Sequence, residues 1–201
     1  MVDNIADAKP DRRPAIVICA YEPDDTSWDP VEDLSGRHWS PPGARTVAVA
    51  AQDPEQLAAV LTRHLRESEC RAVLLVGRNR RSDVFRLQMR AENRALTGGA
   101  RLTPIGPALA RATAPIADMV RALQDAGLAA EASSDGEEDV GDYLLYSLLA
   151  NLRDDADAPA IGLLRTPYDS TAANVQKGVK AAAGAIARHL SPLPHARHSQ
   201  A

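Results

Sequence analysis

The sequence predicts an α/β fold in which a central sheet is covered by helices on both faces. Short apolar segments suited to buried strands alternate along the chain with segments in which apolar residues recur at helical spacing. Ala72–Gly77 is apolar up to its final glycine, which is typical of a strand buried on both faces. Leu57, Leu61 and Leu65 recur every four residues, which indicates one buried face of a helix.

The predicted strands follow from short apolar runs. They are Ala15–Tyr21, Thr46–Ala51, Ala72–Gly77, Leu128–Ala132 and Ala160–Arg165. Val84–Ala95 has a less regular pattern, and we predict a strand or loop that leads on past Gln88.

The predicted helices follow from capping residues as well as periodicity. Asp53 and Pro54 are typical of an N-cap and first turn, and Thr113 is the predicted N-cap of a helix that reaches Asp125 and is closed by Gly127. Two further helices are predicted over Glu137–Leu152 and over the alanine-rich segment Ala172–Leu190.

The composition indicates one domain in the chain of 201 residues. We predict a folded domain over residues 14–190, a disordered tail over 1–13 and a loose tail over 191–201. The formal net charge of −4 gives no general attraction to nucleic acid. No apolar run approaches the ~20 residues of a membrane helix, and the first residues lack the apolar core of a secretory signal, so we expect a cytoplasmic protein without membrane or nucleic-acid partners.

The segment Ala130–Leu149 resembles a known nucleophile segment. It aligns without a gap with the pattern A-x-x-S-x-x-A-G-T-Y/F-V-C-N-x-x-F-Y-x-L. The matching residues are Ala130, Ser133, Val140, Tyr146 and Leu148. The pattern is that of the pyroglutamyl peptidase I family of cysteine peptidases. In this alignment the family's nucleophilic cysteine falls on Gly141 and the following asparagine on Asp142.

Other segments support the resemblance in the same order along the chain. Gly77–Asn93 is similar to G-x-x-x-G-R-x-x-I-x-x-E-R-x-A-x-N, and the family's catalytic glutamate falls on Gln88. Gly162–Tyr168 is similar to G-F-x-H-x-P-Y, and the catalytic histidine falls on Arg165. The start of the chain resembles the family's opening strand and substrate loop, and Thr113–Ala130 resembles its T-L-P-I-x-x-M-V-x-x-L-x-x-A-G-I-x-A segment. The former substrate loop corresponds to Tyr21, Glu22, Pro23 and Asp24.

The resemblance implies a three-layer α/β/α sandwich with a mixed, mostly parallel sheet. It also implies that the strand ends at Tyr21, Gly77 and Arg165 converge on one cleft beside the start of the Glu137 helix. One alternative remains at the nucleophile. A three-residue insertion would place Leu145 there instead of Gly141, and neither residue is a cysteine.

The chemistry of a cysteine peptidase requires a thiolate and a base that keeps it ionised. Gly141 supplies no nucleophile, Gln88 carries no charge, and the guanidinium of Arg165 stays protonated at ordinary pH. Cys19 is expected to be an inert core thiol, and the five histidines are too scattered to suggest a metal site. We therefore expect no intact triad, no metal and no cofactor.

A cluster of arginines is the feature most open to a functional interpretation. Arg78, Arg80 and Arg81 follow a strand at the mouth of the expected cleft, and Arg165 stands in place of the histidine. These residues could form an anion-binding pocket, or an ion-pair network with nearby carboxylates, or they could simply face solvent.

The sequence therefore predicts a catalytically inactive pyroglutamyl-peptidase-like protein with a binding, regulatory or scaffolding role. Its ligand would be a small anion or a protein partner, and the resemblance suggests a homo-oligomer. The alternative is an active hydrolase, or a pyroglutamyl peptidase that removes N-terminal pyroglutamate with non-standard residues.

Overall fold

The computed structural model describes residues 11–22, 34, 38–67, 69–79, 81–152 and 157–191. Its strands are β1 (Ala15–Ala20), β2 (Arg45–Val49), β3 (Cys70–Asn79), β4 (Phe85–Gln88), β5 (Arg90–Glu92), β6 (Leu109–Arg111), β7 (Ala130–Ser133) and β8 (Ala160–Pro167). Its helices are α1 (Pro54–Arg66), α2 (Ile116–Asp125), α3 (Val140–Ala150) and α4 (Ala172–Leu190).

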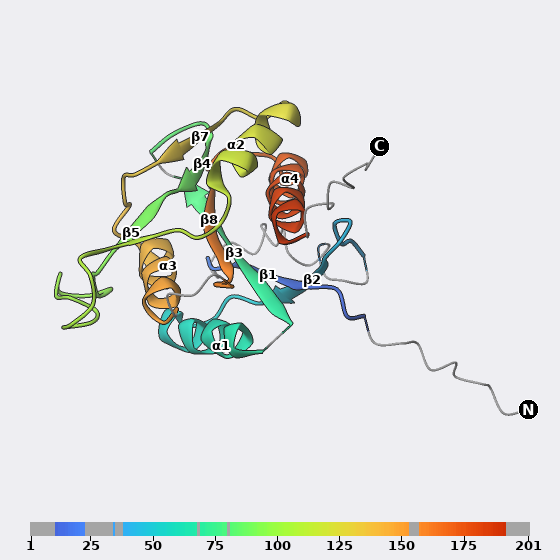
Figure 1. Ribbon diagram of the computed structural model, residues 1–201. Helices are drawn as coiled ribbons and strands as arrows, with labels where there is room; N and C mark the ends of the chain where they lie inside the picture. The colour runs from blue at the N-terminus through green and yellow to red at the C-terminus, as the bar shows by residue number, and fades with distance from the viewer. Residues whose placement is uncertain are drawn as a thin grey trace, which may run out of the picture.

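The main sheet has six strands in the order β2-β1-β3-β8-β4-β7 (Figure 1). Neighbouring strands are parallel except at the β4–β8 pair, which is antiparallel, so that β4 and β7 run against the other four. β5 and β6, which follow β4 in the sequence, form a separate two-stranded antiparallel sheet. The predicted mixed, mostly parallel sheet is confirmed.

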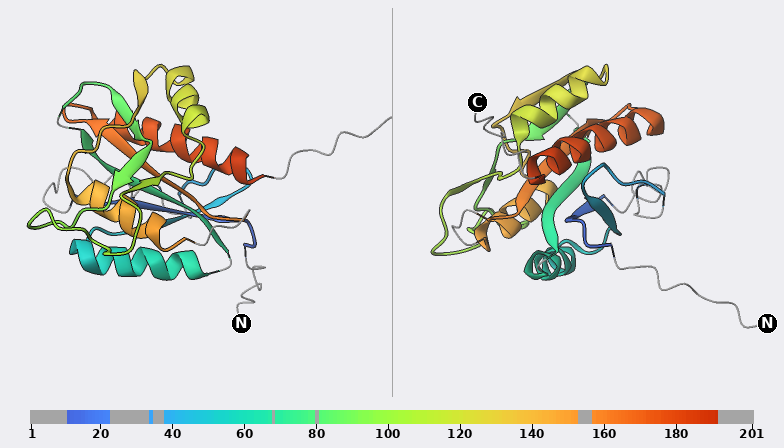
Figure 2. Two further views of the ribbon diagram at one scale, coloured as in Figure 1. Left: turned by 60° about the vertical axis from the view of Figure 1, so that its left-hand side comes forward. Right: turned by 45° about the vertical axis from the view of Figure 1, so that its right-hand side comes forward.

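Two helices cover each face of the sheet, which gives the predicted three layers (Figures 1 and 2). α2 and α4 pack on one face through Met119, Leu123 and the alanine-rich side of α4. α1 and α3 pack on the other face through Leu57, Leu61 and the leucines of α3. Because the chain has few aromatic residues, small and branched aliphatic side chains build both core layers.

Capping residues explain where the helices begin. Asp53 is the N-cap of α1, and its side chain accepts hydrogen bonds from the backbone N–H groups of Glu55 and Gln56 at 3.1 and 3.3 Å. Thr171 caps α4 in the same way through Asn174 N, at 3.3 Å. Gly127, with φ of 75°, closes the end of α2 as predicted.

The predicted N-cap of α2 is wrong. α2 begins at Ile116, and its N-cap position is Pro115 without a side-chain hydrogen bond. Thr113 instead joins the start of β8, because its hydroxyl donates to Pro159 O at 2.6 Å and accepts from Ile161 N at 2.8 Å.

Several predictions lie outside the described residues. These include both tails over most of their length and the greater part of the long loop between Glu22 and Gly43. In the described part of the chain, no helix is long and apolar enough to cross a membrane.

Candidate functional site

The three positions that the resemblance assigns to a catalytic triad lie together. Gln88 ends β4, Gly141 is in the first turn of α3, and Arg165 is on β8. Arg165 Nε donates to Gln88 Oε1 at 3.3 Å, and a Cβ atom on Gly141 would lie 3.2 Å from Arg165 Nη2. Leu145, the alternative nucleophile position, is fully buried in the core with α1, so this convergence favours the gapless alignment.

Arg165 is a buried cation surrounded by carboxylates. Its side chain is 1% exposed. Nη1 and Nη2 donate to Asp139 Oδ2 and Oδ1 at 2.6 and 2.8 Å, which is the two-point geometry of a strong guanidinium–carboxylate pair. Glu137 Oε2 and Asp142 Oδ1 each lie 3.5 Å from the guanidinium. These contacts correspond to the ion-pair network among the predicted alternatives.

A second arginine enlarges this network. Arg86 Nη2 donates to Ser133 Oγ at 2.5 Å, and Arg86 Nε lies 3.1 Å from Glu131 Oε1. Glu137 joins the two guanidinium groups, since its other oxygen lies 3.8 Å from Arg86 Nη1. Sequence reasoning missed Arg86 at this site, because its role depends on the antiparallel register that places Arg86 opposite Arg165.

Gln88 suits this environment because an amide both donates and accepts. Its Nε2 donates to Asp142 Oδ1 at 2.8 Å and to Arg90 O at 3.0 Å, while its Oε1 accepts from Arg165. An ionised glutamate in the same place could accept only, and it would face the carboxylate of Asp142. The amide of Gln88 thus satisfies both a donor and an acceptor in this hydrogen-bond pattern.

The two aspartates of the α3 start have opposite pKa shifts. Burial raises the pKa of Asp139, but the hydrogen bonds and charge of Arg165, together with backbone hydrogen bonds from Asp142 and Gly141, lower it by more, so the pKa lies below its ordinary value. Burial raises the pKa of Asp142 above its ordinary value, since its hydrogen bonds and the more distant Arg165 offset only part of the desolvation. Burial lowers the pKa of Arg165, but Tyr21 and the carboxylates of Asp139 and Glu137 together raise it by more. The pKa therefore lies above its ordinary value, and the guanidinium stays charged.

Tyr21 occupies the space between the strand ends. Its phenol is 2% exposed, and its hydroxyl accepts from Arg165 Nη1 at 3.2 Å. A Cβ atom would lie 1.9 Å from this hydroxyl at Gly77 and 2.3 Å from it at Gly141. The expected convergence of the strand ends is present, but an aromatic ring fills the point of convergence.

Of the other predicted arginines that the structure describes, Arg78 faces away from Arg165. In the β3–β8 register Gly77 pairs with Arg165 and Arg78 with Thr166, so Arg78 and Arg165 face opposite sides of the sheet. Arg78 Nη1 donates to Tyr168 O at 2.5 Å, and its guanidinium lies over the Tyr168 ring. Arg81 is exposed and donates to Gly136 O. The expectation that Arg78 shares a cleft with Arg165 is therefore corrected, while the anion-binding role of Arg81 stays a prediction and Arg80 lies outside the described residues.

The former substrate loop is described only at its start. The side chain of Glu22 accepts from Arg78 N at 3.1 Å, while Pro23 and Asp24 lie outside the described residues.

The cavity beside Asp139 and Asp142 measures about 20 Å³, room for about one water molecule. An ion pair between Arg94 and Glu138 lies at its edge.

Neither cysteine is placed for catalysis. Cys19 is fully buried in β1, and burial raises the pKa of its thiol to about 12. Burial also raises the pKa of Cys70, at the start of β3, to about 11. Both groups are neutral thiols at ordinary pH, which for Cys19 agrees with the prediction of an inert core thiol.

Solved structures of known peptidases resemble this chain. The pyroglutamyl peptidase I of Bacillus amyloliquefaciens is 18% identical and superposes with a TM-score of 0.77 over 87% of this chain and 95% of that one. The chain has the pyroglutamyl peptidase I fold. The pyrrolidone carboxyl peptidase of Thermus thermophilus is 20% identical, with a TM-score of 0.71 over 84% of this chain and 98% of that one. That of Thermococcus litoralis is 15% identical, with a TM-score of 0.70 over 90% and 99%. The sequence matches no protein-family model and no curated protein.

Proposed function

We propose that this chain is a member of the pyroglutamyl peptidase I family that has no peptidase activity and acts by binding. The observation that carries the proposal is the ion pair between the buried Arg165 and the partly exposed Asp139, with N···O distances of 2.6 and 2.8 Å at the position of the family's histidine. The charge of Arg165 is already matched in this pair, which links β8 to the start of α3.

The chemistry of the three positions supports the loss of activity. Acyl transfer through a covalent intermediate requires a nucleophile and a base that activates it. Glycine has no side-chain nucleophile, and a guanidinium with a raised pKa cannot accept a proton. Among the described residues, the cavity that Asp139 and Asp142 line measures about 20 Å³, which is smaller than a pyroglutamyl ring.

The remaining role is that of a binding or scaffolding protein in the cytoplasm. Buried hydrophobic clusters pack on both faces of the sheet. The polar residues around Arg165 connect β8, β4 and the start of α3 through hydrogen bonds. A protein partner or a small anion would therefore bind on the surface of the domain and not at Arg165.

A turnover measurement tests the proposal. The purified full-length protein is incubated with a fluorogenic pyroglutamyl amide, alongside an active pyroglutamyl peptidase I, before and after treatment with iodoacetamide. We expect no release above the buffer blank, and slow alkylation of Cys19 and Cys70 unless the protein is unfolded. Turnover that disappears when either cysteine is alkylated, or replaced by serine, would show an active cysteine hydrolase instead.

A further inference from the structure

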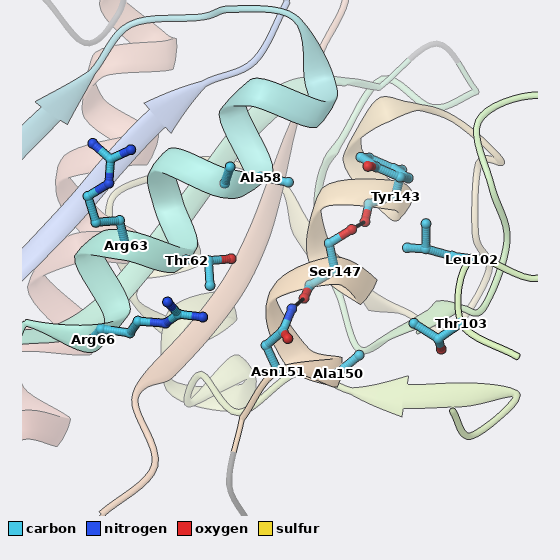
Figure 3. A pocket seen from close by; sticks show the side chains of 11 residues that line it. Ala58, Thr62, Arg63, Arg66, Leu102, Thr103, Tyr143, Ser147, Ala150 and Asn151 are labelled. Atoms are coloured by element: carbon cyan, nitrogen blue, oxygen red, sulfur yellow. Dashed lines mark hydrogen bonds between the residues drawn. The ribbon is translucent and has the colours of Figure 1, made fainter. Parts of the chain in front are cut away.

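A groove of about 540 Å³ lies between α1 and α3, away from the Arg165 cluster (Figure 3). The Arg165 cluster involves the start of α3, whereas this groove runs along α3 to its C-cap, Asn151. The segment containing Leu102 and Thr103 forms its third side. Its volume falls within the range of ~300–1,000 Å³ typical of small-molecule sites.

The charge of this groove differs from that of the whole chain. The chain has 27 acidic and 23 basic residues, yet the described residues that line the groove include Arg63 and Arg66 and no carboxylate. The nearby acidic residues at the end of α1 have other partners. Glu67 lies 3.3 Å from His64, and Glu69 lies 2.6 Å from Arg45.

The two arginines are the unmatched cations of this surface. Within the described ranges, neither Arg63 nor Arg66 makes a hydrogen bond or an ion pair, and both are exposed. Thr62 Oγ1 is likewise without a hydrogen-bond partner there. Figure 3 shows Thr62 and Arg66 projecting from α1 toward the gap, across from Ser147 and Asn151 of α3.

The opposite wall is ordered and partly apolar. Ser147 Oγ donates to Tyr143 O, and Asn151 Nδ2 donates to Ser147 O, both at 2.7 Å. These bonds fix the side chains of the α3 wall before any ligand arrives. Leu102, Ala58 and Ala150 supply apolar surface to the same groove.

We propose that the α1–α3 groove binds a small oxyanion, a phosphate ester or a carboxylate, that carries an apolar substituent. Guanidinium groups bind both anions through paired N–H donors, and the threonine hydroxyl adds a second kind of donor. The apolar lining accommodates the substituent. This site is independent of the triad positions, so its failure would leave the proposed loss of peptidase activity untouched.

Calorimetric titration of the full-length protein with phenyl phosphate and, separately, with benzoate tests the site at constant ionic strength. Arg66→Gln is expected to weaken binding at least tenfold. Arg188→Gln is the matched control, since Arg188 is also an exposed arginine in the last turn of a helix, and it should change the affinity less than twofold. Preference for one probe identifies which oxyanion the groove takes.

Ala59→Glu provides a second variant that should preserve the fold. The new glutamate lies four residues before Arg63 on α1, a spacing that supports a helix. It places a carboxylate in the groove and should also weaken binding at least tenfold. Binding of neither probe would overturn the proposal. So would equal losses in Arg66→Gln and Arg188→Gln, which would indicate nonspecific attraction to surface arginines.

Discussion

Tyr21 fills the space beside Gly141, the residue that the alignment places at the nucleophile position. The phenol of Tyr21 lies where a side chain on Gly141 would have to be, with 2.3 Å between its hydroxyl and a Cβ atom at that position. A cysteine at residue 141 would therefore collide with Tyr21 before it could reach any base. The glycine and the tyrosine form a matched pair.

Gly141→Ala should destabilise the protein by about 1–3 kcal/mol, because an added methyl group in a filled site forces its neighbours to move. In a Tyr21→Leu background the same change should cost much less, since the phenol is gone. Chemical denaturation of the four proteins in this cycle measures the coupling.

Gly184→Ala in α4 is the matched control. A Cβ atom there meets only Arg188 Nη1, at 3.7 Å, so alanine should stabilise the helix by about 0.5–1 kcal/mol. A gain of stability from Gly141→Ala similar to that from Gly184→Ala would contradict the packing of Tyr21 against Gly141.

At the residue scale, the sequence predicted which residues form the site better than it predicted the contacts between their side chains. The alignment assigned Gln88, Gly141 and Arg165 to the three triad positions, and in the structure these residues lie together. The filling role of Tyr21 and the part played by Arg86 could not be predicted, because both depend on side-chain directions set by strand register.

The start of α3 concentrates the acidic partners of Arg165. Asp139 is the N-cap, and its side chain also accepts from Asp142 N at 3.0 Å. Glu138 has a positive φ of 55°, and its N–H donates to Asp142 Oδ2 at 3.0 Å. The segment thus holds two aspartates close together with pKa values shifted in opposite directions.

These shifts predict opposite effects of pH on stability. The pKa of Asp142 is raised above 3.8 in the folded protein. As pH falls toward 3.8, the Asp142 carboxylate is therefore protonated in the folded state before it is protonated in the unfolded state. This protonation increases the free energy of unfolding over that pH range. The pKa of Asp139 is lowered below 3.8, so its stabilising contribution is complete above 3.8 and is lost as pH falls through the lowered value.

Denaturation across the range from neutral to acidic pH separates the two contributions. The stability advantage of the wild type over Asp139→Asn should shrink below pH 3.8. Relative to Asp142→Asn, the wild type should instead gain stability as pH falls toward 3.8. Identical pH profiles for the wild type and both variants would rule out the assigned charge environment.

At the element scale, the long periodic elements were the most predictable. α4 was predicted with its observed bounds, and Asp53 and Gly127 marked helix ends correctly. The short β5 and β6 strands were not resolved by pattern, since three residues with mixed exposure carry little periodicity. Thr113 was misassigned because its hydroxyl bonds to the β8 start rather than to a helix.

At the scale of the whole molecule, alternation of strands and helices predicted a covered sheet, while the mixed strand directions came from the resemblance alone. Periodicity does not encode whether a neighbouring strand runs parallel or antiparallel. The reversed pair β4–β8 is nevertheless essential to the site, because it places Gln88 and Arg86 beside Arg165. The ion-pair cluster therefore ties β8, β4 and α3 into one unit.

A double-mutant cycle between Arg165 and Asp139 tests this account most directly. Arg165→Met leaves buried carboxylates without their cation and should cost about 3–5 kcal/mol. Asp139→Asn removes the charge and keeps an N-cap acceptor. The control is Arg81→Met, at an exposed site, which should change the free energy of unfolding by less than about 0.5 kcal/mol. We predict a favourable coupling of at least about 1 kcal/mol between Arg165 and Asp139 in chemical denaturation. Additive and nearly neutral effects of the two single changes would contradict a structural ion pair between Arg165 and Asp139.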